Sequence, residues 1–220
     1  MRISESTKKQ GRLVALASAL FAAAVVSGCA RYAPSPLPTT PKYRVIEINL
    51  KTASPVSSDY FYYVALDIGP TLSEEGPREI LSGPDRAKNW EYYIRLYDGV
   101  FTEKIISAAE DIDEEPEVFN HNSPLFELAE VSGNSIRIIL RTAGLIPDNA
   151  YIKFNFVTGY YPIRDNDSPA LDFLTQPLIT FQTRLNNYTD NELNSFISTH
   201  QNAQHPAADI DEWSVEVYEK

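Results

Sequence analysis

Short segments in which apolar and polar residues alternate, separated by turn residues, restrict this chain to a β-rich fold. The clearest segment places Ile136, Ile138 and Leu140 on one side and Arg137 and Arg141 on the other. Because side chains of a strand point alternately to opposite faces, this pattern predicts a strand with one buried and one solvated face. Thirteen tyrosines and ten phenylalanines, against one methionine, also favour a β-rich interior.

Two other segments differ in how many apolar faces they present. Ala150–Tyr160 repeats the alternation, so Lys153 and Asn155 are expected on a solvated face. Tyr60–Ile68 is apolar on both faces, which is typical of a strand in the middle of a sandwich. The remaining expected strands are Tyr43–Leu50, Leu125–Glu130, Leu178–Leu185 and a final strand with Trp213, Val215 and Val217 facing the core.

Turn and capping signals complete the expected architecture. Asp98-Gly99 predicts a hairpin that joins Trp90–Tyr97 to Val100–Ser107, although Lys104–Glu110 could equally be helical. Thr189–Glu192 has the spacing of a capping box and predicts one short helix near the C-terminus. Seven or eight strands with a single helix predict a mainly β fold, an antiparallel sandwich of immunoglobulin-like or jelly-roll type, formed by residues 43–220 as one domain.

Residues 1–28 have the pattern of a secretory signal peptide. A basic head precedes the apolar run Leu13–Val26, and small residues follow it. The run has 14 residues, whereas a membrane-spanning helix needs about 20. Residues 29–42 contain four prolines and little that could be buried, so they are expected to form an extended tether.

The end of the leader, Val26-Ser27-Gly28-Cys29, resembles the lipobox of bacterial lipoproteins. The resemblance implies cleavage before Cys29, a thioether-linked diacylglycerol on its sulfur and an acyl chain such as palmitate on its amine. It also implies a place in the cell envelope, outside the cytoplasm, and in the outer membrane of a diderm organism because Ala30 follows the cysteine. Two alternatives are that Cys29 is an ordinary thiol, or that residues 13–28 stay as a membrane helix.

Cysteine content and charge limit what the folded part can do. Cys29 is the only cysteine, so an intramolecular disulfide is impossible and the domain must be held together by its core. Without residues 1–28, 15 basic and 29 acidic side chains remain, a net charge near −14. Such a surface repels phosphate groups, so we expect no nucleic-acid partner and membrane association only through the lipid.

Tyr62–Asp67, Gly69-Pro70 and Trp90–Tyr93 resemble secreted bacterial β-sandwich domains, and some sugar-binding or haem-binding modules of the DOMON type share these features. The resemblance covers about a fifth of the chain and includes no diagnostic ligand. It therefore supports the fold, and no cofactor is expected.

No residue could be assigned to catalysis. The sequence contains neither Gly-x-Ser-x-Gly nor a phosphate-binding loop, and the three histidines, His121, His200 and His205, are expected at the surface. Two acidic stretches, around Asp111 and Asp113 and around Asp165 and Asp167, are weak calcium candidates, because hard cations need several oxygens from one loop. Neither stretch has the spacing of an EF-hand, so solvated loops are the preferred interpretation.

Tyrosines form the only candidate ligand surface, since flat rings stack on sugar faces. The candidates are Tyr92, Tyr93, Tyr97, Tyr160 and Tyr161, although core packing is the simpler explanation for them. The sequence thus predicts a lipid-anchored envelope protein that binds a partner protein or a glycan without catalysis. The alternative is a lipid-anchored hydrolase of envelope glycans or other polymers.

Overall fold

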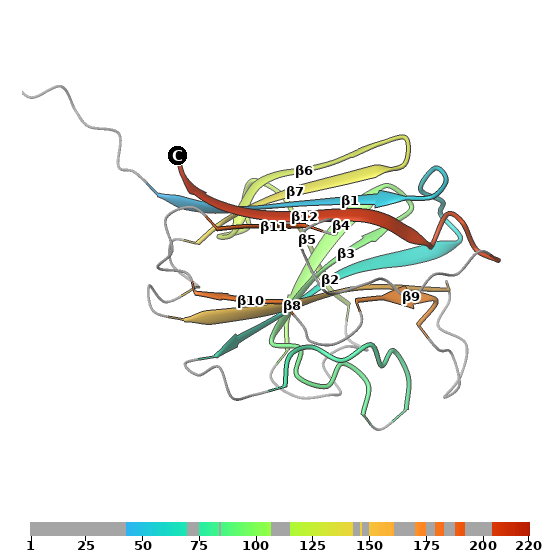
Figure 1. Ribbon diagram of the computed structural model, residues 1–220, viewed down its shortest axis with the longest axis horizontal. Coiled ribbons are helices and arrows are strands. Elements are labelled where there is room, and N and C mark those ends of the chain that lie inside the picture. Colours follow the sequence, from blue (N-terminus) through green and yellow to red (C-terminus); the bar gives the residue numbers. More distant parts are fainter. Residues whose placement is uncertain are drawn as a thin grey trace, which may run out of the picture. The chain divides into compact units, whose positions relative to one another are not determined.

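The computed structural model arranges the chain as two antiparallel β-sheets (Figure 1). It describes residues 43–69, 75–83, 85–106, 115–142, 146, 150–160, 170–174, 179–182, 188–191 and 204–220, all within one unit, Lys42–Lys220. The strands are β1 (Arg44–Thr52), β2 (Tyr60–Gly69), β3 (Tyr92–Tyr97), β4 (Val100–Ile105), β5 (Glu117–Val118), β6 (Phe126–Ser132), β7 (Ser135–Arg141), β8 (Tyr151–Tyr160), β9 (Asp172–Phe173), β10 (Ile179–Gln182), β11 (Tyr188–Asn191) and β12 (Ile210–Glu219).

The strand order confirms the predicted mainly β sandwich. One sheet has five strands in the order β11-β12-β1-β7-β6. The other has seven, in the order β10-β8-β2-β3-β4-β5, with β9 paired to β8. The first and last strands of the domain, β1 and β12, are neighbours over their whole length, so the two ends of the domain are joined by sheet hydrogen bonds.

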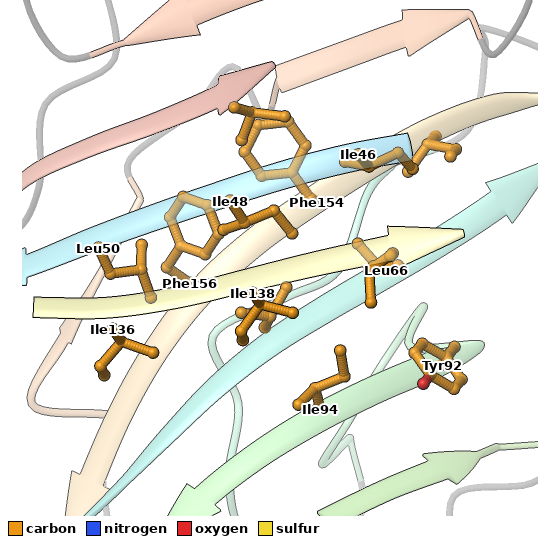
Figure 2. Close-up of a cluster of buried hydrophobic side chains, with 14 of the residues drawn as sticks. Ile46, Ile48, Leu50, Leu66, Tyr92, Ile94, Ile136, Ile138, Phe154 and Phe156 are labelled. Atoms are coloured by element: carbon orange, nitrogen blue, oxygen red, sulfur yellow. The ribbon is translucent and has the colours of Figure 1, made fainter. Parts of the chain in front are cut away.

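The core lies between the two sheets and is built by strand register. Ile48 of β1 lies opposite Val215 of β12 and Ile138 of β7, and all three are almost fully buried. Phe154 and Phe156 of β8 fill the other side of the same cluster, as Figure 2 shows. Burial of such side chains contributes about 1.5–3 kcal/mol each, which lets a domain without disulfides hold itself together.

The predicted hairpin at Asp98-Gly99 is confirmed. β3 and β4 pair antiparallel across it, and both turn residues have positive φ, 48° at Asp98 and 74° at Gly99. These values are those of the tight turn that matches the right-handed twist of the strands. Of the helical alternative Lys104–Glu110, Lys104 and Ile105 belong to β4 and Ile106 follows it without helical structure. Residues 107–110 lie outside the described residues.

The predicted C-terminal helix does not start where the capping box suggested. Thr189 and Asn191 belong to strand β11, which pairs with β12. Pairing with a neighbouring strand therefore overrides the local capping signal at these residues. Residues 192–203, which include the rest of the predicted helix, lie outside the described part of the chain.

The prediction that Lys153 and Asn155 face water is wrong, because the seven-stranded sheet is covered on both faces. Residues 75–83 and 85–90, called here the covering segment, contribute Leu81, Ala87 and Trp90 to a second apolar cluster on the outer side of this sheet. Lys153 is only 2% exposed and Asn155 is fully buried.

Each of these buried polar side chains has partners. The Lys153 ammonium lies 3.0 Å from a carboxylate oxygen of Asp67, which is also buried. Asn155 donates from its Nδ2 to the Pro77 carbonyl at 3.0 Å and accepts from the Leu174 amide at 3.0 Å. These hydrogen bonds replace those that Lys153 and Asn155 would make with water, so β8 can hold polar side chains inside the protein.

Candidate functional site

The outer face of the five-stranded sheet carries a hollow of about 670 Å³. It lies over the ends of β1, β7 and β12 near the β6–β7 hairpin. Charged side chains at its rim stay accessible, with exposed fractions of 41% for Lys51, 42% for Arg137, 51% for Glu130 and 62% for Glu212. This part of the outer face is called the open face below.

Strand register brings the residues of the open face together from distant parts of the sequence. Asn49 of β1 lies between Arg137 of β7 and Ser214 of β12 in one row across the sheet. Because the neighbouring residues in each strand, such as Ile48 and Leu50, face the core, these polar residues point outward. Alternation on three strands therefore gathers these polar side chains at the hollow.

Hydrogen bonds hold the side chains of the open face in place. Asn49 donates from Nδ2 to the Ser214 hydroxyl at 3.2 Å. Arg137 donates from Nε to Glu47 at 2.8 Å and from Nη1 to Glu130 at 3.3 Å. Burial opposes ionisation of Glu47, but hydrogen bonds from Arg137 and Tyr218 bring its pKa below the ordinary value. The face thus presents ionised, positioned donors and acceptors next to small hydroxyl side chains.

The other half of the same outer face carries a second ionic cluster, centred on Glu127. Glu127 accepts hydrogen bonds from Arg141 at 2.6 Å, from Lys220 at 2.5 Å and from the Tyr43 hydroxyl. Hydrogen bonds from Lys220 and Arg141 lower the pKa of Glu127 to about 2. Tyr43 is the first described residue and Lys220 the last, so this cluster joins the two ends of the domain.

The Glu127 cluster leads to a pH-dependent stability prediction. The folded state lowers the pKa of this carboxyl from 4.5 to about 2, so its contribution is fully present above about pH 4.5 and is lost as the pH falls through 2. Glu127→Gln should lower the free energy of unfolding by about 1 kcal/mol at neutral pH, since its cationic partners are half-exposed.

Urea unfolding of both proteins at neutral pH and at about pH 3 measures this difference, which should shrink at the lower pH. An equal difference at both pH values would show that the carboxylate charge is not the stabilising feature.

The structure places the predicted tyrosine candidates apart from one another. Tyr92 and Tyr93 are buried, on opposite faces of β3. The Tyr92 hydroxyl donates a hydrogen bond to the buried Glu103. The pKa of Tyr92 is raised mainly by burial and, to a smaller extent, by the Glu103 carboxylate. The Tyr97 ring packs against Phe61 at 5.0 Å between centroids. Tyr160 is 37% exposed, and Tyr161 lies outside the described residues.

Tyr160 belongs to an aromatic cluster that sequence reasoning missed. Its hydroxyl lies 2.6 Å from Nε2 of His205, and the Tyr60 hydroxyl lies 3.3 Å from Nδ1 of the same ring. His205 is half-buried, whereas His121 is exposed as predicted, and His200 lies outside the described residues. The pairing of Tyr60 with Tyr160 across β2 and β8 creates this cluster, and no local motif announces it.

The remaining predicted site residues are not described by the structure. Cys29 and the calcium candidates Asp111, Asp113, Asp165 and Asp167 lie outside the described residues. Within the described ranges, no group of three or more histidine, cysteine or acidic side chains is arranged to hold a metal ion. Nor does the described part contain a helix of sufficient length and hydrophobicity to cross a bilayer.

Comparisons with known proteins add no further assignment. No family model, no curated protein and no solved structure matches this chain. The hydrolase alternative stays a prediction.

Proposed function

We propose that this chain is a lipid-anchored extracytoplasmic envelope protein whose β-sandwich is a non-enzymatic binding module. The leader, the lipobox-like Val26–Cys29 and the proline-rich residues that follow support the anchor. Two or more acyl chains convert marginal membrane association into stable attachment, at about 0.8 kcal/mol for each buried methylene.

The binding proposal depends on one difference between the two outer faces of the sandwich: one is covered by another segment and the other is accessible. The covering segment buries the outer side of the seven-stranded sheet, with Trp90 2% exposed. The open face of the other sheet keeps its polar side chains accessible around a hollow of about 670 Å³. Binding sites are usually concave and carry a few polar groups that are held in place, and the open face has both features.

The net charge of the protein limits which kinds of partner can bind. The net charge near −14 of residues 29–220 disfavours anionic partners, nucleic acid included. A neutral glycan or a neutral or basic protein surface can bond the hydroxyl of Ser214, the amide of Asn49 and the carboxylate of Glu130. The module therefore binds an envelope protein or glycan at the open face.

Retention on native envelope material tests this function. Tagged protein is purified from mildly solubilised envelopes, and bound protein and glycan are quantified for the unmodified chain, for Ser214→Trp, which fills the hollow, and for Asp85→Trp, which alters an exposed residue of the covering segment. Ser214→Trp should reduce retention at least fivefold, and Asp85→Trp should not. Equal retention by the two variants, or none by the unmodified chain, would contradict the proposal.

A further inference from the structure

The edge strand β6 is the longest open edge among the described strands. Each sheet ends in edge strands, and β10 and β11 have four residues each and β5 has two, whereas β6 has seven. Short edges protect a sheet from unwanted pairing, and a long edge is a template for another strand. A bulge between Phe126 and Leu128 interrupts only the first part of β6.

Register shows which backbone groups of β6 point away from the sheet. The Thr52 amide donates to the Asn134 carbonyl at 2.9 Å, so Ile136 and Ile138, two and four residues further on, also direct their backbone groups toward β1. Ser135 and Arg137 then direct theirs toward β6, where they pair with Ser132 and Glu130. The N–H and C=O groups of the residues between, Ala129 and Val131, therefore point outward from the edge.

The side chains along this edge differ between the two faces of the sheet. On the core side, Ala129 packs against the main apolar cluster and Val131 remains 38% exposed. On the outer side, Glu130 and Ser132 line the hollow of the open face, and the Glu130 side chain is 51% exposed. A strand added here would place alternate residues beside Val131 and beside Glu130.

We propose that β6 binds an extended segment of a partner protein by strand addition, and that this segment alternates basic and apolar residues. Its apolar residues cover Val131 on the core side. Its basic residues pair with Glu130, whose carboxylate accepts one hydrogen bond from Arg137 and, at 51% exposure, can accept another. Main-chain hydrogen bonds to Ala129 and Val131 provide affinity, and the alternating side chains provide specificity.

Charge selects this occupant over a second copy of the chain. Pairing β6 with itself would bring Glu130 side chains together on one face of two chains whose residues 29–220 each carry a net charge near −14. The inference rests on the proposed function, because Glu130 and Ser132 belong to the proposed binding hollow.

Peptide binding to the full lipidated protein in detergent micelles tests strand addition. The probe is a labelled nine-residue peptide of alternating lysine and valine, and binding is measured by fluorescence anisotropy. Val131→Pro removes an outward N–H that makes no bond within the sheet, so folding is retained and affinity should fall at least tenfold. Val131→Thr, which keeps the N–H and the branched side chain, should bind within threefold of the unmodified protein.

Two further probes keep the test independent of the proline variant. A peptide N-methylated at alternate residues should bind the unmodified protein at least tenfold more weakly, and a glutamate–valine peptide should not bind measurably. Unchanged affinity for Val131→Pro and for the N-methylated peptide would overturn the proposal. So would a dimer of the unmodified protein that Val131→Pro converts to a monomer, because the occupant would then be a second copy.

The retention assay separates this inference from the proposed function. Loss of retention with both Ser214→Trp and Val131→Pro supports strand addition. Loss with Ser214→Trp alone overturns strand addition and leaves the proposed function standing. Retention that Ser214→Trp does not reduce counts against the proposed function itself.

Discussion

Replacing Cys29 by serine is expected to abolish incorporation of labelled palmitate completely. Cys29 is the only thiol in the chain, so no other residue can form the thioether that the lipobox-like sequence implies. The measurement is metabolic labelling of both proteins, followed by mass determination of the amino-terminal peptide. The unmodified protein should begin at Cys29 and carry the mass of a diacylglycerol and one further acyl chain.

A matched control separates the lipid from the leader. An ordinary cleavable secretory leader joined to residue 30 should deliver a water-soluble protein that partitions out of detergent, because the negative net charge of the domain opposes binding to anionic lipids. Equal palmitate labelling of Cys29→Ser, or a mature amino terminus at another residue, would refute the anchor.

Removing the Asp67 carboxylate should destabilise the domain by about 3–5 kcal/mol. Asp67→Ala leaves the Lys153 ammonium, 2% exposed and 3.0 Å from that carboxylate, as an uncompensated buried charge. The loss is comparable to the whole stability of many domains, so a large fraction of the protein should be unfolded. Thermal and urea unfolding of the soluble form measure the effect.

Two further variants show whether burial of the Lys153 charge causes the loss of stability. The double substitution of Asp67→Leu with Lys153→Met removes both charges and should recover most of the lost stability, since apolar replacements of buried ion pairs are often neutral or stabilising. Glu212→Ala breaks the exposed pair with Lys51 and should leave the midpoint of unfolding nearly unchanged. Equal effects of Asp67→Ala and Glu212→Ala would contradict the buried-charge explanation.

The strands could be predicted where the apolar pattern alone was enough to mark them, on one face or on both. Tyr43–Leu50, Tyr60–Ile68 and the Asp98-Gly99 hairpin agree with β1, β2 and the β3–β4 turn. Alternation fails for β8 because a polar residue looks solvated whether or not another segment covers it. The glycines, prolines and charges of the covering segment indicate a loop, and nothing in them indicates that this loop packs on the sheet. The burial of Lys153 was therefore not predictable.

The candidate site was less predictable than the fold because it depends on long-range register. Asn49 and Ser214 are 165 residues apart, and Tyr60 and His205 are 145 apart. Neither pair belongs to a local motif. The pairing of β1 with β12 brings Asn49 and Ser214 together. His205 reaches Tyr60 from the segment just before β12, where the Tyr62 hydroxyl donates to the Ala207 carbonyl. Tyr92 and Tyr93 are buried on opposite faces of a covered sheet, which agrees with the simpler explanation of core packing for these two residues.

Thiol labelling of Ser214→Cys tests most directly whether the open face is occupied in the cell envelope. With Cys29 acylated, the introduced cysteine would be the only free thiol of the protein. Its rate of reaction with a maleimide should be at least tenfold lower in intact envelopes than in the purified protein, whereas Asp85→Cys on the covering segment should react equally in both. Equal rates for Ser214→Cys in the two preparations would show that nothing binds the open face and would contradict the account.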